Sequence, residues 1–302
     1  MDVFTREIVG RSNAQAVTFA LLSDLHLDAS DHDDEALTAD LDAAKSIGAR
    51  ISINGDIFDA IVPSDRKRHH PSVSRADPDR DDIFNQLVEG GVNRLAPVAD
   101  LIDVISPGNH ERSVLKYHHI DLVSMLVYGL NQRRDPKLPP IHQGSYRGYQ
   151  RYVFKWESGN SCIQFVVFRH HGTGGAAPVT GGSLDLDRIR KDFDADLYWI
   201  GHKHSGISRP FTRVSLGSQG RLRVRQQRGV MSAGYKRQFS LESPEHNGDI
   251  ADFGEQFYQL SQTGAQWVYV EAHRKALTNS SGWRDGLRWT VADSPAVLLR
   301  TA

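Results

Sequence analysis

The chain has 302 residues, of which 39% are hydrophobic and 9% aromatic, a composition typical of a globular protein and not of a disordered chain. Its formal net charge of −1 excludes an overall attraction to nucleic acid or anionic lipid, so any such attraction must come from local patches. Cys162 is the only cysteine, which excludes an intrachain disulfide and favours a reducing compartment. The sequence has neither an apolar stretch of membrane-spanning length nor a signal-peptide pattern, so we expect a cytoplasmic protein with no membrane partner.

The first half of the chain is predicted to alternate strands with helices after an N-terminal tail over residues 1–15. Apolar and β-branched runs predict strands at Val17 to Leu22, Arg50 to Asn54 and Leu101 to Ile105. Helical patterns are predicted from Asp33 or Asp34 to Gly48, from Asp82 to Leu95, and over Val114 to Leu130. The basic, proline-containing segment from Val62 to Arg80 is predicted to be a loop. This order indicates a mostly parallel sheet covered by helices.

The second half is predicted to be rich in strands. Tyr152 to Trp156 and Cys162 to Phe168 indicate a hairpin, and a short helix over Leu184 to Phe193 precedes a buried strand at Leu197 to Ile200. Further strands are predicted at Val214 to Leu216, Arg221 to Val224, Trp267 to Glu271 and Leu287 to Val291. We therefore predict an α/β (α+β) fold of two stacked mixed β-sheets flanked by helices, with a β-rich C-terminal third. The predicted units are a core over residues 16–235 and an extension over residues 236–302.

Five short polar motifs directly follow predicted strands. They are Asp24-Leu25-His26, Gly55-Asp56-Ile57-Phe58-Asp59, Gly108-Asn109-His110-Glu111, His170-His171-Gly172 and Gly201-His202-Lys203-His204. Open α/β sheets place their sites at the ends of strands, so we expect these side chains to gather along one rim. Carboxylates, an amide oxygen and imidazoles together suit a pair of divalent transition metals.

In all five motifs, from Asp24 to His204, the chain resembles the calcineurin-like metallophosphoesterase superfamily. The resemblance implies a four-layer sandwich and a two-metal hydrolase of phosphodiesters or phosphomonoesters, in which a hydroxide that bridges the metals attacks phosphorus. Asp56 matches the carboxylate shared by both metals. The resemblance places Asp24, His26 and His204 at the first metal, and Asn109, His202 and one of His170 and His171 at the second. We favour His170, and the metals are left open among Mn, Fe, Zn, Co and Ni.

The resemblance also implies a proton donor and a substrate. His110 matches the general acid or phosphoryl-stabilising histidine, with Asp59 as its carboxylate partner and Glu111 as the alternative. Ala60 stands where Ser/Thr protein phosphatases carry an arginine, which disfavours that activity. The expected partner is a phosphoester, with nucleotides and nucleic acid among the candidates. The oligomeric state and the natural substrate are left open.

Two alternatives to a small-molecule phosphoesterase remain, a DNA-processing nuclease of the repair-exonuclease type and a catalytically silent scaffold. Arg66, Lys67 and Arg68 either grip substrate phosphate or belong to a solvated loop. The segment from Tyr146 to Tyr152 interleaves rings and cations as single-strand binders do, although an ordinary strand edge is the favoured interpretation. A continuous basic and aromatic track through both segments would favour the nuclease.

Overall fold

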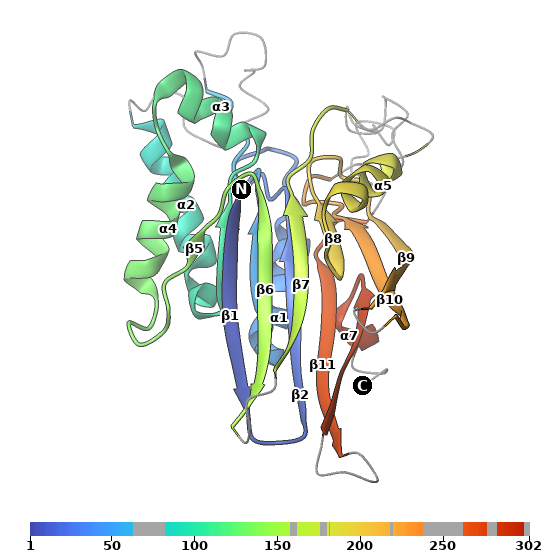
Figure 1. Ribbon diagram of the computed structural model, residues 1–302. Coiled ribbons are helices and arrows are strands. Elements are labelled where there is room, and N and C mark those ends of the chain that lie inside the picture. The colour runs from blue at the N-terminus through green and yellow to red at the C-terminus, as the bar shows by residue number, and fades with distance from the viewer. Residues whose placement is uncertain are drawn as a thin grey trace.

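Two six-stranded sheets form the centre of the protein (Figure 1). A computed structural model describes residues 1–62, 82–157, 162–175, 180, 182–217, 220–237, 262–276 and 283–298. Within these residues the two sheets are mixed and helices cover their outer faces. The predicted α/β fold of two stacked mixed sheets is therefore confirmed.

The first sheet has the strand order β12-β11-β2-β3-β4-β5. Its strands are β2 (Ala14–Leu22), β3 (Arg50–Asn54), β4 (Ile102–Ser106), β5 (His142–Gln143), β11 (Gln266–Ala276) and β12 (Trp283–Ala292). The four strands β2 to β5 are parallel, whereas β11 and β12 run antiparallel at one edge. The predicted β-rich C-terminal region thus extends the parallel sheet that carries the first three motifs.

The second sheet has the order β1-β6-β7-β8-β10-β9. Its strands are β1 (Asp2–Gly10), β6 (Arg147–Trp156), β7 (Cys162–His170), β8 (Leu197–Ile200), β9 (Ile207–Leu216) and β10 (Leu222–Met231). The residues predicted to be a tail include β1, which pairs in parallel with β6. Its exposure alternates strictly, with Phe4 and Ile8 packed against the inter-sheet core, while Val3 and Val9 face outward. Nothing described here tests the predicted division into a core and an extension.

Helices flank the two sheets, and some of them are capped by a side chain or by a left-handed residue. They are α1 (Asp34–Ile47), α2 (Ile83–Leu95), the 3₁₀ helix η1 (Ala96–Leu101), α3 (Asn109–His118), α4 (Leu122–Arg133), α5 (Ser183–Asp192) and α7 (Pro295–Leu298). The helical pattern predicted over Val114 to Leu130 corresponds to two helices, because α3 ends at His118 and α4 begins at Leu122. His119 adopts a left-handed φ of 57° that ends α3, and the Asp121 side chain caps α4 by accepting from the Ser124 amide.

Three apolar clusters separate the layers. Along β2, Ala20 and Leu22 pack with α1, α2 and α4, while Phe19 and Leu21 pack between the two sheets. The outer face of the second sheet packs against Leu186 of α5. The order is therefore helices, sheet, sheet and helix, which is the predicted four-layer sandwich. In the part of the chain that the structure describes, no helix is both long enough and apolar enough to cross a bilayer.

Candidate metal centre

The turns after β2, β3 and β8 hold predicted ligands on left-handed backbone. Positive φ angles between 48° and 72° occur at Asp24, His26, Asp56, His202 and His204. L-residues adopt this conformation at a cost, and such positions concentrate at functional sites. Two backbone hydrogen bonds join the first two turns, from the amides of Asp24 and His26 to the carbonyls of Gly55 and Asp56, over 2.9 and 3.0 Å. The two predicted carboxylate ligands are therefore held by one interlocked pair of turns.

The first group of predicted ligands consists of Asp24, His26 and His204. One ligand atom from each lies within 4.8 Å of the others, and all three side chains are buried. The amide of His202 donates to both Asp24 oxygens over 2.8 and 2.9 Å, and the Ser23 hydroxyl also donates to this carboxylate. The structure thus brings together the three residues predicted for the first metal.

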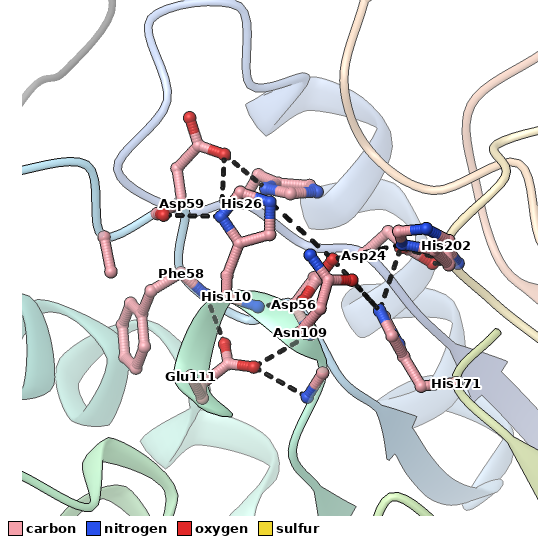
Figure 2. Close-up of polar contacts among 12 residues, drawn as sticks. Asp24, His26, Asp56, Phe58, Asp59, Asn109, His110, Glu111, His171 and His202 are labelled. Carbon is pink, nitrogen blue, oxygen red and sulfur yellow. Dashed lines mark hydrogen bonds and ion pairs between the residues drawn. The ribbon is translucent and has the colours of Figure 1, made fainter. Parts of the chain in front are cut away.

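The second group consists of Asp56, His171 and His202, again with ligand atoms within 4.8 Å of one another. His171 Nε2 lies 3.0 Å from Asp56 Oδ2 and 3.1 Å from Asn109 Oδ1, as Figure 2 shows. The two groups adjoin, because Asp24 Oδ1 lies 4.0 Å from His171 Nε2 and 3.7 Å from His204 Nε2. The predicted ligands therefore form a single cluster of two carboxylates, an amide oxygen and four imidazoles.

His171, and not His170, belongs to this cluster. His171 is fully buried, and its Nδ1 donates to the carbonyl of Asn54 over 2.7 Å, which leaves Nε2 toward Asp56 and Asn109. His170 is the last residue of β7, and its Nδ1 accepts from the amide of Gly172 over 2.9 Å. Successive side chains at a strand end point to opposite sides, so only one of the pair can face the cluster. The structure therefore places His171, and not the favoured His170, among the other predicted ligands.

Asp59 has a different partner from the one predicted. Its Oδ1 accepts from His26 Nδ1 over 2.8 Å, whereas His110 Nδ1 lies 3.6 Å from that oxygen and donates to the Asp59 backbone carbonyl over 2.6 Å. Asp59 thus orients His26 through its carboxylate and His110 through its backbone. The buried His26 Nε2 has no hydrogen-bond partner among the described residues, as expected of a metal-ligating histidine whose other nitrogen donates to a carboxylate.

Glu111 accepts hydrogen bonds from backbone amides and does not hydrogen-bond His110 in the described structure. Its Oε1 accepts from Ile57 and Phe58 over 2.7 and 3.0 Å, and its Oε2 accepts from Gly108 and Asp56 over 2.8 and 3.1 Å (Figure 2). The side chain is 3% exposed, so these buried amides depend on the Glu111 carboxylate as their hydrogen-bond acceptor. The carboxylate ties the turn after β3 to the start of α3.

A family model described as calcineurin-like phosphoesterase matches residues 17–206, a span that contains every residue of the cluster. The chain belongs to the calcineurin-like phosphoesterase family. Comparison with curated proteins gives no match.

Solved structures of similar proteins include other phosphoesterases. A predicted phosphoesterase from Streptococcus pneumoniae is 11% identical, covers 91% of this chain and 99% of its own, and has a TM-score of 0.27. A metallophosphoesterase from Sphaerobacter thermophilus is 14% identical, with 84% and 83% covered and a TM-score of 0.33. GAP50, the anchor in the inner membrane complex of Plasmodium, is 9% identical, with 89% and 88% covered and a TM-score of 0.38. At such TM-scores the family membership rests on the sequence match.

The charges in this phosphoesterase centre suit cations. Burial alone would raise the pKa of Asp56, but His171 and His110 outweigh it and hold that pKa well below its usual range. Burial would likewise lower the pKa of His171, but Asp56 and Asp24 raise it to about 10. The buried carboxylates of Asp24 and Asp56 favour positive charge nearby, and His26 Nε2 has no hydrogen-bond partner among the described residues. These features fit a pair of divalent ions.

Two glycines of the family motifs are required by close backbone approach. A Cβ on Gly108 would lie 2.0 Å from Asp56 Oδ1, and one on Gly201 would lie 2.0 Å from Ser23 Oγ and 2.7 Å from Asp24 Oδ2. No side chain fits at such distances without displacing a carboxylate of the cluster. Glycine at these two positions therefore allows the backbone to pack in direct contact with the carboxylates of Asp56 and Asp24.

Sequence reasoning missed two charged residues that support Asp59. Asp28 is buried and accepts from the amides of Asp59 and Ala60 over 2.6 and 2.9 Å. Lys236 Nζ lies 3.7 Å from Asp59 Oδ2 and 3.4 Å from Asp31 Oδ1. Asp28 was within reach of sequence reasoning, since it follows the end of the first motif by two residues. Lys236 stands far from every motif and had no such signal.

Two segments that the sequence analysis weighed as substrate contacts have different outcomes. Arg66, Lys67 and Arg68 lie outside the described residues, so their role stays a prediction. In the Tyr146–Tyr152 segment, Tyr152 is fully buried and Tyr149 packs against Phe168, so this part of the segment belongs to the core.

Proposed function

We propose that this calcineurin-like phosphoesterase hydrolyses phosphodiesters, and phosphomonoesters less well, with two divalent metal ions. The observation that carries the proposal is the convergence of the predicted ligands on one buried cluster. They are Asp24, His26, Asp56, Asn109, His171, His202 and His204. When bound, a pair of divalent ions supplies Lewis-acid stabilisation to phosphoryl oxygens and acidifies water.

His110 is the residue that we assign to proton transfer. Its Nδ1–H donates to the Asp59 carbonyl, so the other ring nitrogen, Nε2, remains available and lies 3.9 Å from Asp56 Oδ2. Burial lowers the pKa of His110, and Asp56 only partly offsets this, so a proton on Nε2 is readily given up. When the bond from phosphorus to the leaving oxygen breaks, that oxygen takes the proton.

Asp59 and Glu111 are positioning residues in this proposal. Asp59 fixes the tautomer of His26 with its carboxylate and the direction of His110 with its carbonyl. Glu111 gathers four amides from the two turns that carry Asp56 and Asn109. Neither carboxylate touches the substrate.

The preference for diesters is supported by space beside the cluster. A diester carries an organic group on each side of phosphorus, whereas a monoester carries one. A cavity of about 530 Å³ is lined by Asn109 and runs away from the cluster along α3. This volume is in the range of small-molecule sites and provides room for a second ester substituent.

The test measures turnover with defined metals. The purified protein is stripped with a chelator, reloaded with Mn²⁺, and given bis(p-nitrophenyl) phosphate or p-nitrophenyl phosphate, alongside His110→Ala and Asp56→Asn. His118→Ala is the matched control, because His118 is an exposed histidine on the same helix. Faster diester turnover that collapses in the first two variants only would support the proposal. Two bound metals without turnover, with Mn²⁺, Zn²⁺ or Fe²⁺, would favour the silent scaffold.

A further inference from the structure

A groove leads from the metal centre along α3. It consists of two neighbouring cavities of about 550 and 530 Å³, both lined by Arg112, Leu115, Tyr146 and Thr173. His170 lines the first cavity and Asn109 lines the second, so both compartments begin beside the cluster. The family motifs contribute Asn109, Glu111 and His170 to its lining, and the rest of the described lining belongs to no motif.

Three cationic side chains line the groove. Arg112 and Lys116 stand one helical turn apart on α3, and Arg147 faces them from the start of β6. All three are exposed. The one carboxylate in its lining besides the buried Glu111 is Asp121, which is already engaged with the Ser124 amide and the Gln143 side chain. The described lining is therefore net positive, although the whole chain carries a formal charge of −1.

Two tyrosine rings lie against these cations, and Lys116 Nζ lies 4.8 Å from the ring centroid of Tyr117. The Arg112 guanidinium lies 4.9 Å from the ring centroid of Tyr146, whose hydroxyl donates to the Gly172 carbonyl over 2.5 Å and so fixes the ring. Tyr117 lines the second cavity and is 67% exposed. An exposed tyrosine beside cations offers a face on which a planar base can stack.

We propose that this groove binds a single-stranded oligonucleotide, with phosphates on Arg147, Arg112 and Lys116 and bases on Tyr117 and the Arg112–Tyr146 pair. Each compartment is large enough for one nucleotide, so the two together suit an extended chain. Unpaired bases are needed, because paired bases would hide their faces from the tyrosines. The inference rests on the proposed function, since it names the substrate class that reaches the metal centre.

The proposed groove overlaps only in part with the basic and aromatic track that the sequence analysis named as the mark of a nuclease. In the segment from Tyr146 to Tyr152, only Tyr146 and Arg147 line the groove, and residues of α3 supply the rest. The other cations and rings of the groove thus come from a helix about 30 residues earlier in the chain, which the sequence of the segment alone does not reveal.

The test measures binding without turnover. Fluorescence anisotropy of a labelled oligo-dT of about ten nucleotides, in chelator and at several salt concentrations, gives the Kd and its salt dependence. Tyr117→Ala is compared with Tyr128→Ala, which removes a 70% exposed tyrosine from α4. Arg147→Gln is compared with Arg151→Gln, which removes an exposed arginine of the same strand that does not line the groove.

We expect Tyr117→Ala to weaken binding about fivefold or more, the effect of losing one stacked base. Arg147→Gln should weaken binding and reduce the slope of log Kd against log salt by about 0.7. Tyr128→Ala and Arg151→Gln should match the unmodified protein. Absence of saturable binding, or equal losses in the control variants, would overturn the inference.

The outcome separates this inference from the proposed function. Turnover of bis(p-nitrophenyl) phosphate without oligonucleotide binding would overturn the groove and leave the phosphoesterase intact. Groove-dependent binding in chelator, without hydrolysis of any diester after metal loading, would support the groove and overturn the proposed function.

Discussion

Replacing Glu111 with glutamine tests whether this buried carboxylate holds the site together or moves protons. The carboxylate accepts from four amides, two on each oxygen, at 2.7 to 3.1 Å. Glutamine keeps one acceptor oxygen and turns an NH₂ group toward the other two amides. Two buried backbone N–H groups then face the glutamine NH₂ group, which cannot accept from them. Water cannot replace the lost acceptor, because the side chain at this position is 3% exposed.

The cost follows from those two lost acceptors. A buried N–H without a partner costs about 1–3 kcal/mol, so Glu111→Gln should lose about 2–6 kcal/mol of unfolding free energy. Since domains are stable by about 5–15 kcal/mol, most of the variant should still fold. With a urea m-value of about 3 kcal/mol/M, the unfolding midpoint should fall by about 1–2 M.

The assay is urea unfolding followed by tryptophan fluorescence, which reports on the buried Trp199 and Trp267. It is run at about pH 8, because burial and the nearby Asp56 raise the pKa of Glu111 to about 7 and the prediction concerns the ionised form. Glu157→Gln is the control, since Glu157 is exposed and, among the described residues, its side chain pairs with the surface residue Arg11, a contact worth about 0–1 kcal/mol. A Glu111→Gln midpoint equal to that of the unmodified protein, with a shifted pH profile of turnover, would refute the positioning role.

Three further predictions follow from single contacts. His171→Ala should lower the number of metal ions retained after gel filtration, measured by plasma mass spectrometry, whereas His170→Ala should not; the reverse result would restore the original preference. Asp59→Ala should weaken metal affinity about 10–100-fold by freeing the ring of His26, and a titration with unchanged affinity would contradict this. Asp2 has a lowered pKa, because His142 and Arg169 outweigh its burial. Its ionised side chain therefore stabilises the fold when the pH is above 3.8, the pKa of the unfolded state, and this contribution is lost as the pH falls below 3.8 toward the pKa of the folded state. The melting temperature of Asp2→Asn should therefore fall less steeply than that of the unmodified protein as the pH is lowered from about 5 to about 3. Parallel plots of melting temperature against pH would contradict this role of Asp2.

The candidate ligands could be predicted from the sequence because each follows a recognisable strand. A buried apolar run followed at once by Asp, Asn or His places a polar group at a sheet edge, and Asp24, Asp56 and Asn109 all come after parallel strands of one sheet. The helix from Asp34 to Gly48 was predictable for the same local reason, since Asp33 caps one end and a left-handed Gly48 closes the other.

The features that the sequence did not reveal depend on contacts between residues that are distant in the chain. Residues 2–10 form β1 only because β6 lies alongside, about 145 residues later, and their mixed polarity gives a weak strand signal alone. The choice between His170 and His171 depends on where β7 ends and which side faces Asp56. The sequence did not reveal that the Asp59 carboxylate hydrogen-bonds His26, because two histidines, His26 and His110, lie within reach of that carboxylate.

The left-handed backbone at five ligand positions also bears on whether this centre can be transplanted. If each non-glycine residue in that conformation costs about 1 kcal/mol, the five together cost about 5 kcal/mol, comparable with the stability of a whole small domain. A short peptide that copied the motifs would relax to extended backbone and separate Asp24 from Asp56. Grafting this centre onto another protein therefore requires moving the interlocked turns and the two sheets behind them, because the geometry is a property of the scaffold and not of the motifs.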